Sequence, residues 1–239
     1  MDASALISDL FLVALLGGVV SLDRRCAFQV MISQPIVAVP ALGLLMGMPE
    51  MGLWLGGVLQ LLWMSSVLFG ANVPPNETVA SIAIGGTVFL FGKYMGEVTT
   101  PVWAVAILAG VPLSLLGRTV EVWFDRDNLR LLARADLAAI AGTPRTLTTV
   151  TLWGLARIFV ANVIIIALGI FFGLGVLLVL DGGDLAARLR FCLEGIGVYI
   201  IPALGLAVAF SVLRQRGALV VAAFSFVATI AFITPGAGS

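Results

Sequence analysis

The chain has 239 residues, of which 61% are hydrophobic and 11% are charged, and its mean hydropathy is +1.14. Soluble domains average about 45–50% apolar and about 25% charged residues, so the composition indicates an integral membrane protein. The formal net charge is zero, which argues against an electrostatic partner such as nucleic acid. Apolar stretches recur from Ala3 to Ile233, whereas a secretory signal peptide would confine them to the N-terminus.

Charge-poor runs define the expected membrane segments, because a helix needs about 20 apolar residues to cross the hydrocarbon core. Two runs have unsuitable lengths: 78–92 is short for a straight span, and 146–180 is long for one. We therefore predict an all-α, polytopic integral membrane protein, a single domain over 1–239, with broken or re-entrant helices. The seven or eight segments are 3–22, 26–49, 51–70, 78–92, 98–117, 146–180, 195–213 and 217–233.

The stretch 118–145 is polar and rich in arginine. Arg126, Arg130 and Arg134 share one helical face, apolar residues occupy others, and a stop signal follows at 142–144. Arginine-rich loops favour the cytoplasmic side of a membrane, so we predict one cytoplasmic amphipathic helix lying along the membrane surface. A solvated loop without a function of its own is an equally good interpretation of this stretch.

Paired glycines indicate close helix packing. Gly43 and Gly47, and Gly52 and Gly56, each match the G-x-x-x-G spacing that lets two helix backbones approach in lipid. Some such matches must arise by chance among 27 glycines.

The stretch GGVLQLLWMSSVLFGANVPPNE, residues 56–77, begins as a membrane helix and ends differently. Pro74 and Pro75 donate no backbone hydrogen bonds, so the chain should leave helical geometry near 72–76. Non-helical backbone at membrane depth is tolerated where it is buried in protein or lines a watery cavity. A carboxylate such as Glu77 at that depth marks a functional site. The alternative is an ordinary turn outside the membrane.

A second polar group lies upstream of this stretch. Asp23 is followed by two arginines, a pattern typical of a solvated turn. Gln29, Ser33 and Gln34 then lead into a long apolar run, which makes them candidates for polar groups at a helix end near a cavity.

These residues occur in an order that resembles the enzyme IIC component of the mannose/fructose/sorbose-type sugar phosphotransferase system, a bacterial membrane permease. The resemblance is clear over about residues 15–85 and is plausible by length and hydropathy beyond them. It rests on Leu22-Asp23-Arg24, Gln34-Pro35-Ile36-Val37, Gly43-x-x-x-Gly47, GGVLQ at 56–60, GANVPPN at 70–76 and Ala80-Ser81-Ile82.

The chain departs from the family pattern at three positions. Gln60 stands where many members have Glu, and Gln34 stands where a basic or imidazole residue is common. Asn76 follows the two prolines where an acid is common, and Glu77 comes one residue later.

The resemblance implies a permease domain in the bacterial cytoplasmic (inner) membrane that binds a hexose or amino sugar and passes it inward. A soluble phosphorylated IIB component would phosphorylate the sugar, a homologous IID membrane subunit would be the partner, and the assembly would be a trimer of IIC–IID pairs. No cofactor or metal is implied. The expected sugar contacts are Gln60, Asn72, Asn76 and Glu77, with Asp23, Gln34 and Trp63 as further candidates. For Trp63, packing within the protein is the alternative role.

Two other classes of function are an intramembrane enzyme and a non-transporting membrane subunit. The chain has no histidine, no H-E-x-x-H and no G-x-S-x-G, so an intramembrane enzyme is disfavoured and no catalytic residue is expected. Cys26 and Cys192 read as small apolar packing residues, so neither is expected to carry a phosphoryl group. A non-transporting sensor or assembly subunit stays open, because Gln60 and Asn76 replace acidic residues.

Overall fold

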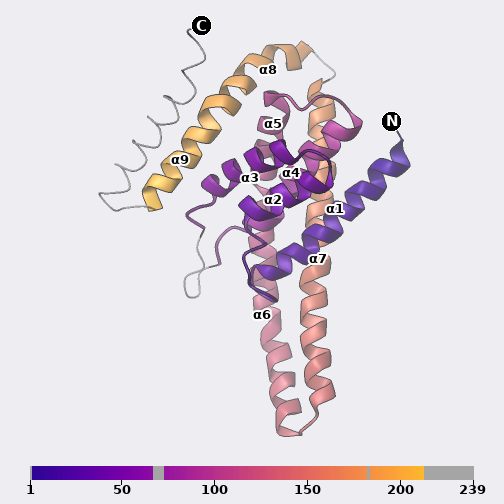
Figure 1. Cartoon of the computed structure of the whole chain (residues 1–239). Coiled ribbons are helices and arrows are strands. Elements are labelled where there is room, and N and C mark those ends of the chain that lie inside the picture. The colour runs from indigo at the N-terminus through magenta and orange to yellow at the C-terminus, as the bar shows by residue number, and fades with distance from the viewer. Residues whose placement is uncertain (1, 67–72, 182–183, 213–239) are drawn as a thin grey trace.

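A computed structural model of the chain describes residues 2–66, 73–181 and 184–212, and over these residues it is helical, with no β-strand. Figure 1 shows a packed body of helices, a long hairpin that projects from it, and α8 and α9 along one flank. The predicted all-α polytopic class is confirmed. The elements are α1 (Ala3–Asp23), α2 (Pro35–Leu45), α3 (Pro49–Leu62), α4 (Glu77–Tyr94), α5 (Thr100–Gly110), α6 (Leu113–Ile140), α7 (Pro144–Asp181), α8 (Asp184–Gly195), the π-helical turn η1 (Ile196–Ile200) and α9 (Ile201–Val212).

Helix α4 is the centre of the body. Every residue from Glu77 to Phe91 is buried, and α1, α2, α5 and α7 pack around the helix. Small residues allow this packing, because a Cβ on Gly86 would lie only 2.7 Å from Ile170 of α7. The predicted segment 78–92 is therefore a core helix of the body.

Helices α2 and α3 form a short antiparallel pair. They have 11 and 14 residues, far fewer than the expected spans 26–49 and 51–70. Gly47, with a φ of +78°, makes the turn between them. A Cβ on Gly43 would lie 2.8 Å from the Cα of Gly52, so the two backbones touch. The predicted close packing is confirmed for Gly43, Gly52 and Gly56 and is wrong for Gly47, which has open space around it. These two helices are too short to cross a membrane alone.

The expected break within 146–180 is wrong. Helix α7 runs without interruption for 38 residues, about 57 Å, which is nearly twice the thickness of a hydrocarbon core. Its second half packs in the body and its first half extends into the hairpin (Figure 1). The extra length therefore builds a projection, which a count of apolar residues does not distinguish from a broken span.

The hairpin of α6 and α7 contains the arginine-rich stretch. Residues 118–140 are helical, which agrees with the expected helix, but α6 packs lengthwise against α7 and does not lie alone along a surface. Arg157 of α7 forms an ion pair with Asp127 of α6, and its guanidinium lies 5.0 Å from the centre of the Phe124 ring. Gly142, with a φ of +64°, makes the turn at the tip.

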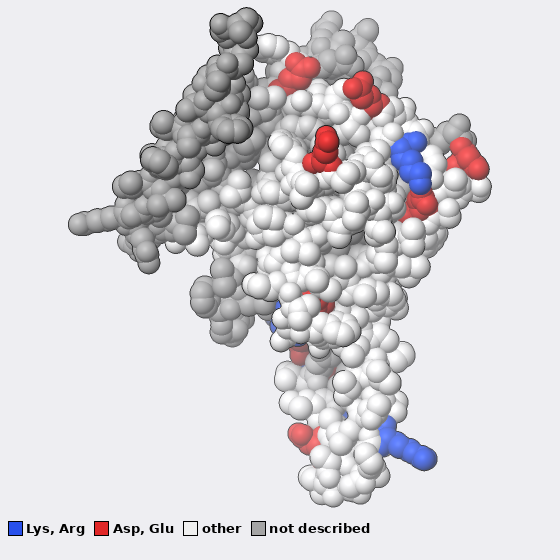
Figure 2. Space-filling model, in the orientation of Figure 1, with Lys and Arg blue, Asp and Glu red and all other residues white. Residues whose placement is uncertain are grey.

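Among residues 2–66, 73–181 and 184–212, four helical stretches are long and apolar enough to cross a membrane: Ala3–Asp23, Thr100–Ile140, Pro144–Leu180 and Phe191–Val212. Figure 2 shows that the middle of the visible face is nearly free of charged side chains, which gather at the end of the body opposite the hairpin and along the hairpin. The chain is thus a multi-pass membrane protein.

Candidate functional site

Arg24 is the centre of a polar cluster at the base of the hairpin. It follows α1 directly and is only 8% exposed. Its Nε and Nη2 donate to the two carboxylate oxygens of Glu77 at 3.1 and 2.9 Å. Its Nη1 donates to both oxygens of Glu121 on α6, at 2.7 and 2.6 Å. The interpretation of Asp23 and its neighbours as a solvated turn is therefore wrong.

The charge of Arg24 is maintained by these partners. Burial alone would lower the pKa of its guanidinium, but the nearby charges of Glu77 and Glu121 raise that pKa above its ordinary value. Arg24 is thus a fixed cation that joins α1, α4 and α6.

The double proline is held by the same guanidinium. Residues 73–76 are non-helical, as predicted, and α4 begins at Glu77. Arg24 Nη2 donates to the carbonyl oxygen of Pro75 at 3.0 Å, and Pro74 is buried. The carbonyls that the break exposes therefore face a protein cation, and this part of the break is not an ordinary exposed turn.

Asn76 links the start of α4 to α6 through hydrogen bonds. Its Oδ1 accepts a hydrogen bond from the backbone N–H of Val79, which makes it the N-cap of α4. Its Nδ2 donates to Glu121 at 2.8 Å, and its backbone N–H donates to the carbonyl of Ser114 at 2.8 Å. Gly117 makes the approach possible, because a Cβ there would lie 2.7 Å from the Cβ of Asn76.

Asp23 orders the loop between α1 and α2. Its carboxylate accepts hydrogen bonds from the backbone N–H groups of Val30 and Ser33, at 2.7 and 3.1 Å. Within this loop Phe28 and Met31 have φ values of +64° and +69°, in a region that residues other than glycine rarely adopt. The side chain of Asp23 is therefore used to hold a strained loop in one conformation.

Gln34 and Gln60 form the second polar group. Gln60 Nε2 donates to Gln34 Oε1 at 3.1 Å, and Gln60 Oε1 accepts from the backbone N–H of Ile36 at 3.2 Å. Both side chains are half-buried. An amide has two donor hydrogens, so the Gln34 amide and the second N–H of Gln60 keep donors without a partner among the described residues.

The two groups are neighbours. The carbonyl oxygen of Ser33, next to Gln34, accepts a hydrogen bond from the Thr78 hydroxyl at 3.0 Å, next to Glu77. Trp63, at the end of α3, is 9% exposed and belongs to the apolar core, as its packing alternative predicts. Asn72 lies outside the described residues. The structure thus brings Asp23, Asn76 and Glu77 into internal contacts and leaves the Gln34–Gln60 pair with free donors.

Sequence reasoning missed Glu121 as a partner of the site. The sequence indicates this role only weakly, because Glu121 lies within an arginine-rich stretch that is typical of a protein surface. The pairing of Arg24 with Glu77 had a better signal, since one is a cation that ends an apolar segment and the other an acid that begins one.

A small hollow of about 190 Å³ adjoins the Arg24 cluster and is lined in part by Arg25, Cys26 and Asp125. Arg25 donates to Asp125 at 3.0 Å. Partial burial raises the pKa of the Cys26 thiol. Arg25 opposes this effect, and the carboxylates of Glu121 and Asp125 add to it. Cys26 and Cys192 are both exposed in the chain, so the expectation that they pack in the interior is wrong.

The sequence matches the protein family described as the PTS system sorbose-specific IIC component over residues 7–237, nearly the whole chain. The chain belongs to this family. IIC components are membrane permease subunits, so this chain is a permease subunit of a phosphotransferase system. The suspected relationship is confirmed.

Solved structures share the fold of this IIC component. One described as a membrane protein aligns with a TM-score of 0.65 and 19% identity, over 96% of this chain and 88% of that one. Another is the cryo-EM structure of the mannose transporter ManYZ in complex with microcin E492. It aligns with a TM-score of 0.54 and 19% identity, over 95% of this chain and 87% of that chain. A comparison with curated protein sequences found no match.

Proposed function

We propose that this IIC component binds a hexose or amino sugar and passes it inward, where a soluble IIB component phosphorylates it. The observation that carries the proposal is the Gln34–Gln60 pair, which offers free amide donors beside a break in the helical backbone. Sugar hydroxyls both donate and accept hydrogen bonds, as amides do. The family membership supports the same function.

In this proposal Gln60 and Gln34 are the direct sugar contacts. Asp23, Asn76 and Glu77 are positioning residues in the described conformation, because each is bonded to the protein itself. Asn76 and Glu77 contact the sugar only in a state in which Arg24 releases the double-proline segment. Asn72 remains a proposed contact on the resemblance alone, whereas Trp63 is a packing residue in the described conformation.

The hairpin end of the body is proposed to face the cytoplasm. Eight arginines lie on the hairpin or at its base, and positive residues favour the cytoplasmic side. They are Arg24, Arg25, Arg118, Arg126, Arg130, Arg134, Arg145 and Arg157. We place the contact with the soluble IIB component here, with Arg130 and Arg134 on its docking face. The remaining partners are a IID subunit and two further copies of the pair, in the bacterial inner membrane.

The phosphoryl group is proposed never to reside on this chain. Phosphotransferase relays use histidine or cysteine, and this chain has no histidine. The raised pKa of Cys26 leaves little of its nucleophilic thiolate near neutral pH, and Cys192 lies on α8 and not on the hairpin. The subunit acts by holding a sugar hydroxyl in line with the phosphoryl donor.

The test is sugar phosphorylation by membrane vesicles that contain the complete complex, with the soluble components and a radiolabelled phosphoryl donor. Label should remain on the soluble partner and pass to sugar only when this subunit is present. Radiolabel on this subunit would contradict the proposal that the phosphoryl group passes directly from the soluble partner to the sugar. Normal assembly without uptake or sugar phosphorylation, across a panel of hexoses and amino sugars, would instead favour a non-transporting sensor.

A further inference from the structure

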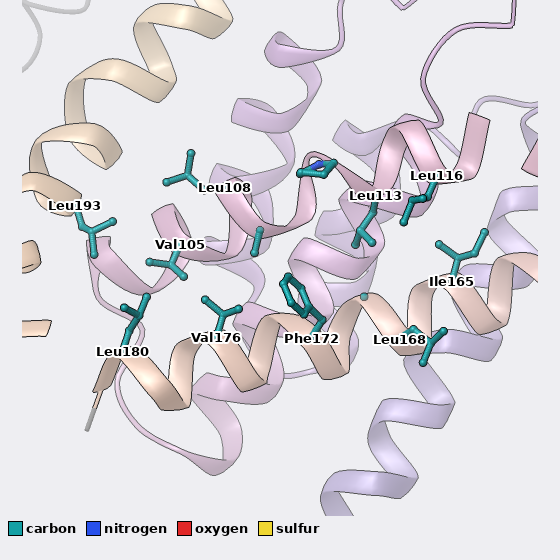
Figure 3. A pocket seen from close by; sticks show the side chains of 13 residues that line it. Val105, Leu108, Leu113, Leu116, Ile165, Leu168, Phe172, Val176, Leu180 and Leu193 are labelled. Carbon is teal, nitrogen blue, oxygen red and sulfur yellow. The ribbon is translucent and has the colours of Figure 1, made fainter. Parts of the chain in front are cut away.

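A groove on the side of the body is lined, in the described part of the chain, only by apolar residues, glycine and proline. It lies between α5, the start of α6 and α7, and its volume is about 820 Å³. Figure 3 shows side chains of α5 and α6 opposite those of α7, with Leu180 and Leu193 at one end and Leu116 and Ile165 at the other. Because no polar side chain lines it, the groove offers no hydrogen bonds to a sugar.

The length of the groove fits an acyl chain. From Ile165 to Leu180 the α7 axis advances about 22 Å. Acyl chains, which span half of a hydrocarbon core about 30 Å thick, are short enough for the groove.

Near the hairpin end of the groove, α6 carries a polar surface, and Leu116 of the groove lies one helical turn before Thr119 of that surface. A hollow of about 420 Å³ there is lined by Leu115, Arg118, Thr119, Val122, Trp123 and Arg126. Leu115 is adjacent to Leu116 of the groove. Trp123 is 59% exposed, as is common for tryptophan at the membrane–water boundary.

The two arginines of this hollow are available to an anion. Both are exposed, and neither forms an ion pair within the described part of the chain. Arg134 and Arg145, farther out on the hairpin, have no ion pair there either, but they do not line the hollow. Exposed arginines at the end of an apolar groove match an anionic lipid headgroup in charge and in position.

We propose that the groove and the hollow together form a binding site for an anionic phospholipid. Its acyl chains lie between α5 and α7, and its phosphate lies at Arg118 and Arg126, with Trp123 at the boundary. The site lies apart from the sugar contacts and does not depend on them.

The test is native mass spectrometry of the full chain in detergent, with phosphatidylglycerol or phosphatidylcholine added. Phosphatidylglycerol should bind on the order of 10-fold more tightly than phosphatidylcholine. The double variant Arg118→Gln/Arg126→Gln should lose this preference, and Arg134→Gln/Arg145→Gln on the outer hairpin should keep it. Inorganic phosphate at millimolar concentration should not compete.

The groove itself is tested with a matched pair of variants. Leu168→Trp fills the groove, whereas Leu178→Trp changes an exposed residue of the same helix that does not line it. Phospholipid binding should fall only in the first variant. Equal affinity for the two lipids, competition by phosphate, or equal effects of both tryptophans would overturn the proposal. A photo-crosslinker at Leu168 that captures a polypeptide in native membranes in place of lipid would assign the groove to a partner helix.

Discussion

Arg24 donates two hydrogen bonds to Glu77, which lies 53 residues later in the chain, and this buried pair fixes the end of α1 to the start of α4. Their side chains are 3% and 8% exposed. Two charges removed from water are tolerated only when the geometry of the pair is good and further hydrogen bonds complete it. Glu121, Asn76 and the Pro75 carbonyl supply those further bonds.

Removal of Arg24 should strongly destabilise the protein. In Arg24→Gln the carboxylates of Glu77 and Glu121 lose their buried cation, which should lower the free energy of unfolding by about 3–5 kcal/mol. Denaturant unfolding in detergent micelles measures this change. Arg130→Gln is the control, because its ion pair is exposed and 3.7 Å long, and it should cost less than about 1 kcal/mol. Equal effects of the two variants would show that the buried pair does not hold the helices together.

Gly117 is predicted to be essential for the contact between α4 and α6. A Cβ there would meet Asn76, so Gly117→Ala should reduce the free energy of unfolding by about 1–3 kcal/mol. Gly154→Ala on α7 has open space around it and should be neutral or stabilising by up to about 1 kcal/mol. The comparison of the two variants in the same unfolding assay separates the steric effect of the added Cβ from the higher helix propensity of alanine. A higher free energy of unfolding in Gly117→Ala would contradict the close contact between Gly117 and Asn76.

Cys26 should react slowly with thiol reagents near neutral pH. The ordinary pKa of a cysteine thiol is 9.0, and the pKa of Cys26 is raised above it. Less of the reactive thiolate is therefore present at a given pH. The rate of alkylation in a Cys192→Ala background should therefore rise with a midpoint above pH 9.0. The same protein in denaturant provides the reference, and a native midpoint at or below that reference contradicts the prediction.

Part of this fold could be predicted from the sequence. The charge-poor runs located α1 and α4 closely, because each is a continuous apolar helix bounded by polar residues. The run 26–49 predicted a full span where α2 has only 11 residues, since the non-helical residues 26–34 and the turn at Gly47 contain no charge that would interrupt the run. The run 51–70 is also free of charge, yet α3 ends at Leu62. These features depend on hydrogen bonds and backbone angles that hydropathy does not reveal.

The candidate site was predicted in residue type better than in role. The resemblance to the IIC family implies Asn76 and Glu77 as sugar contacts, and the cost of a carboxylate in a membrane segment separately predicts that Glu77 has a role. The structure supplies a different reason for each: Asn76 caps α4, and Glu77 pairs with Arg24. Such a pairing joins distant parts of the chain, and no local pattern in a single sequence distinguishes a ligand contact from an internal one.

The affinity of the purified complex for hexoses and amino sugars, measured before and after Gln60→Ala, tests most directly whether the Gln34–Gln60 pair binds sugar. Loss of a hydrogen-bond partner should cost about 1–3 kcal/mol, or about 5- to 150-fold in affinity. The melting temperature and the recovery of the partner subunit should stay unchanged, because Gln60 is half-buried and its bonds lie at one helix end. Unchanged sugar affinity in Gln60→Ala, with the complex intact, would show that this pair does not bind the sugar.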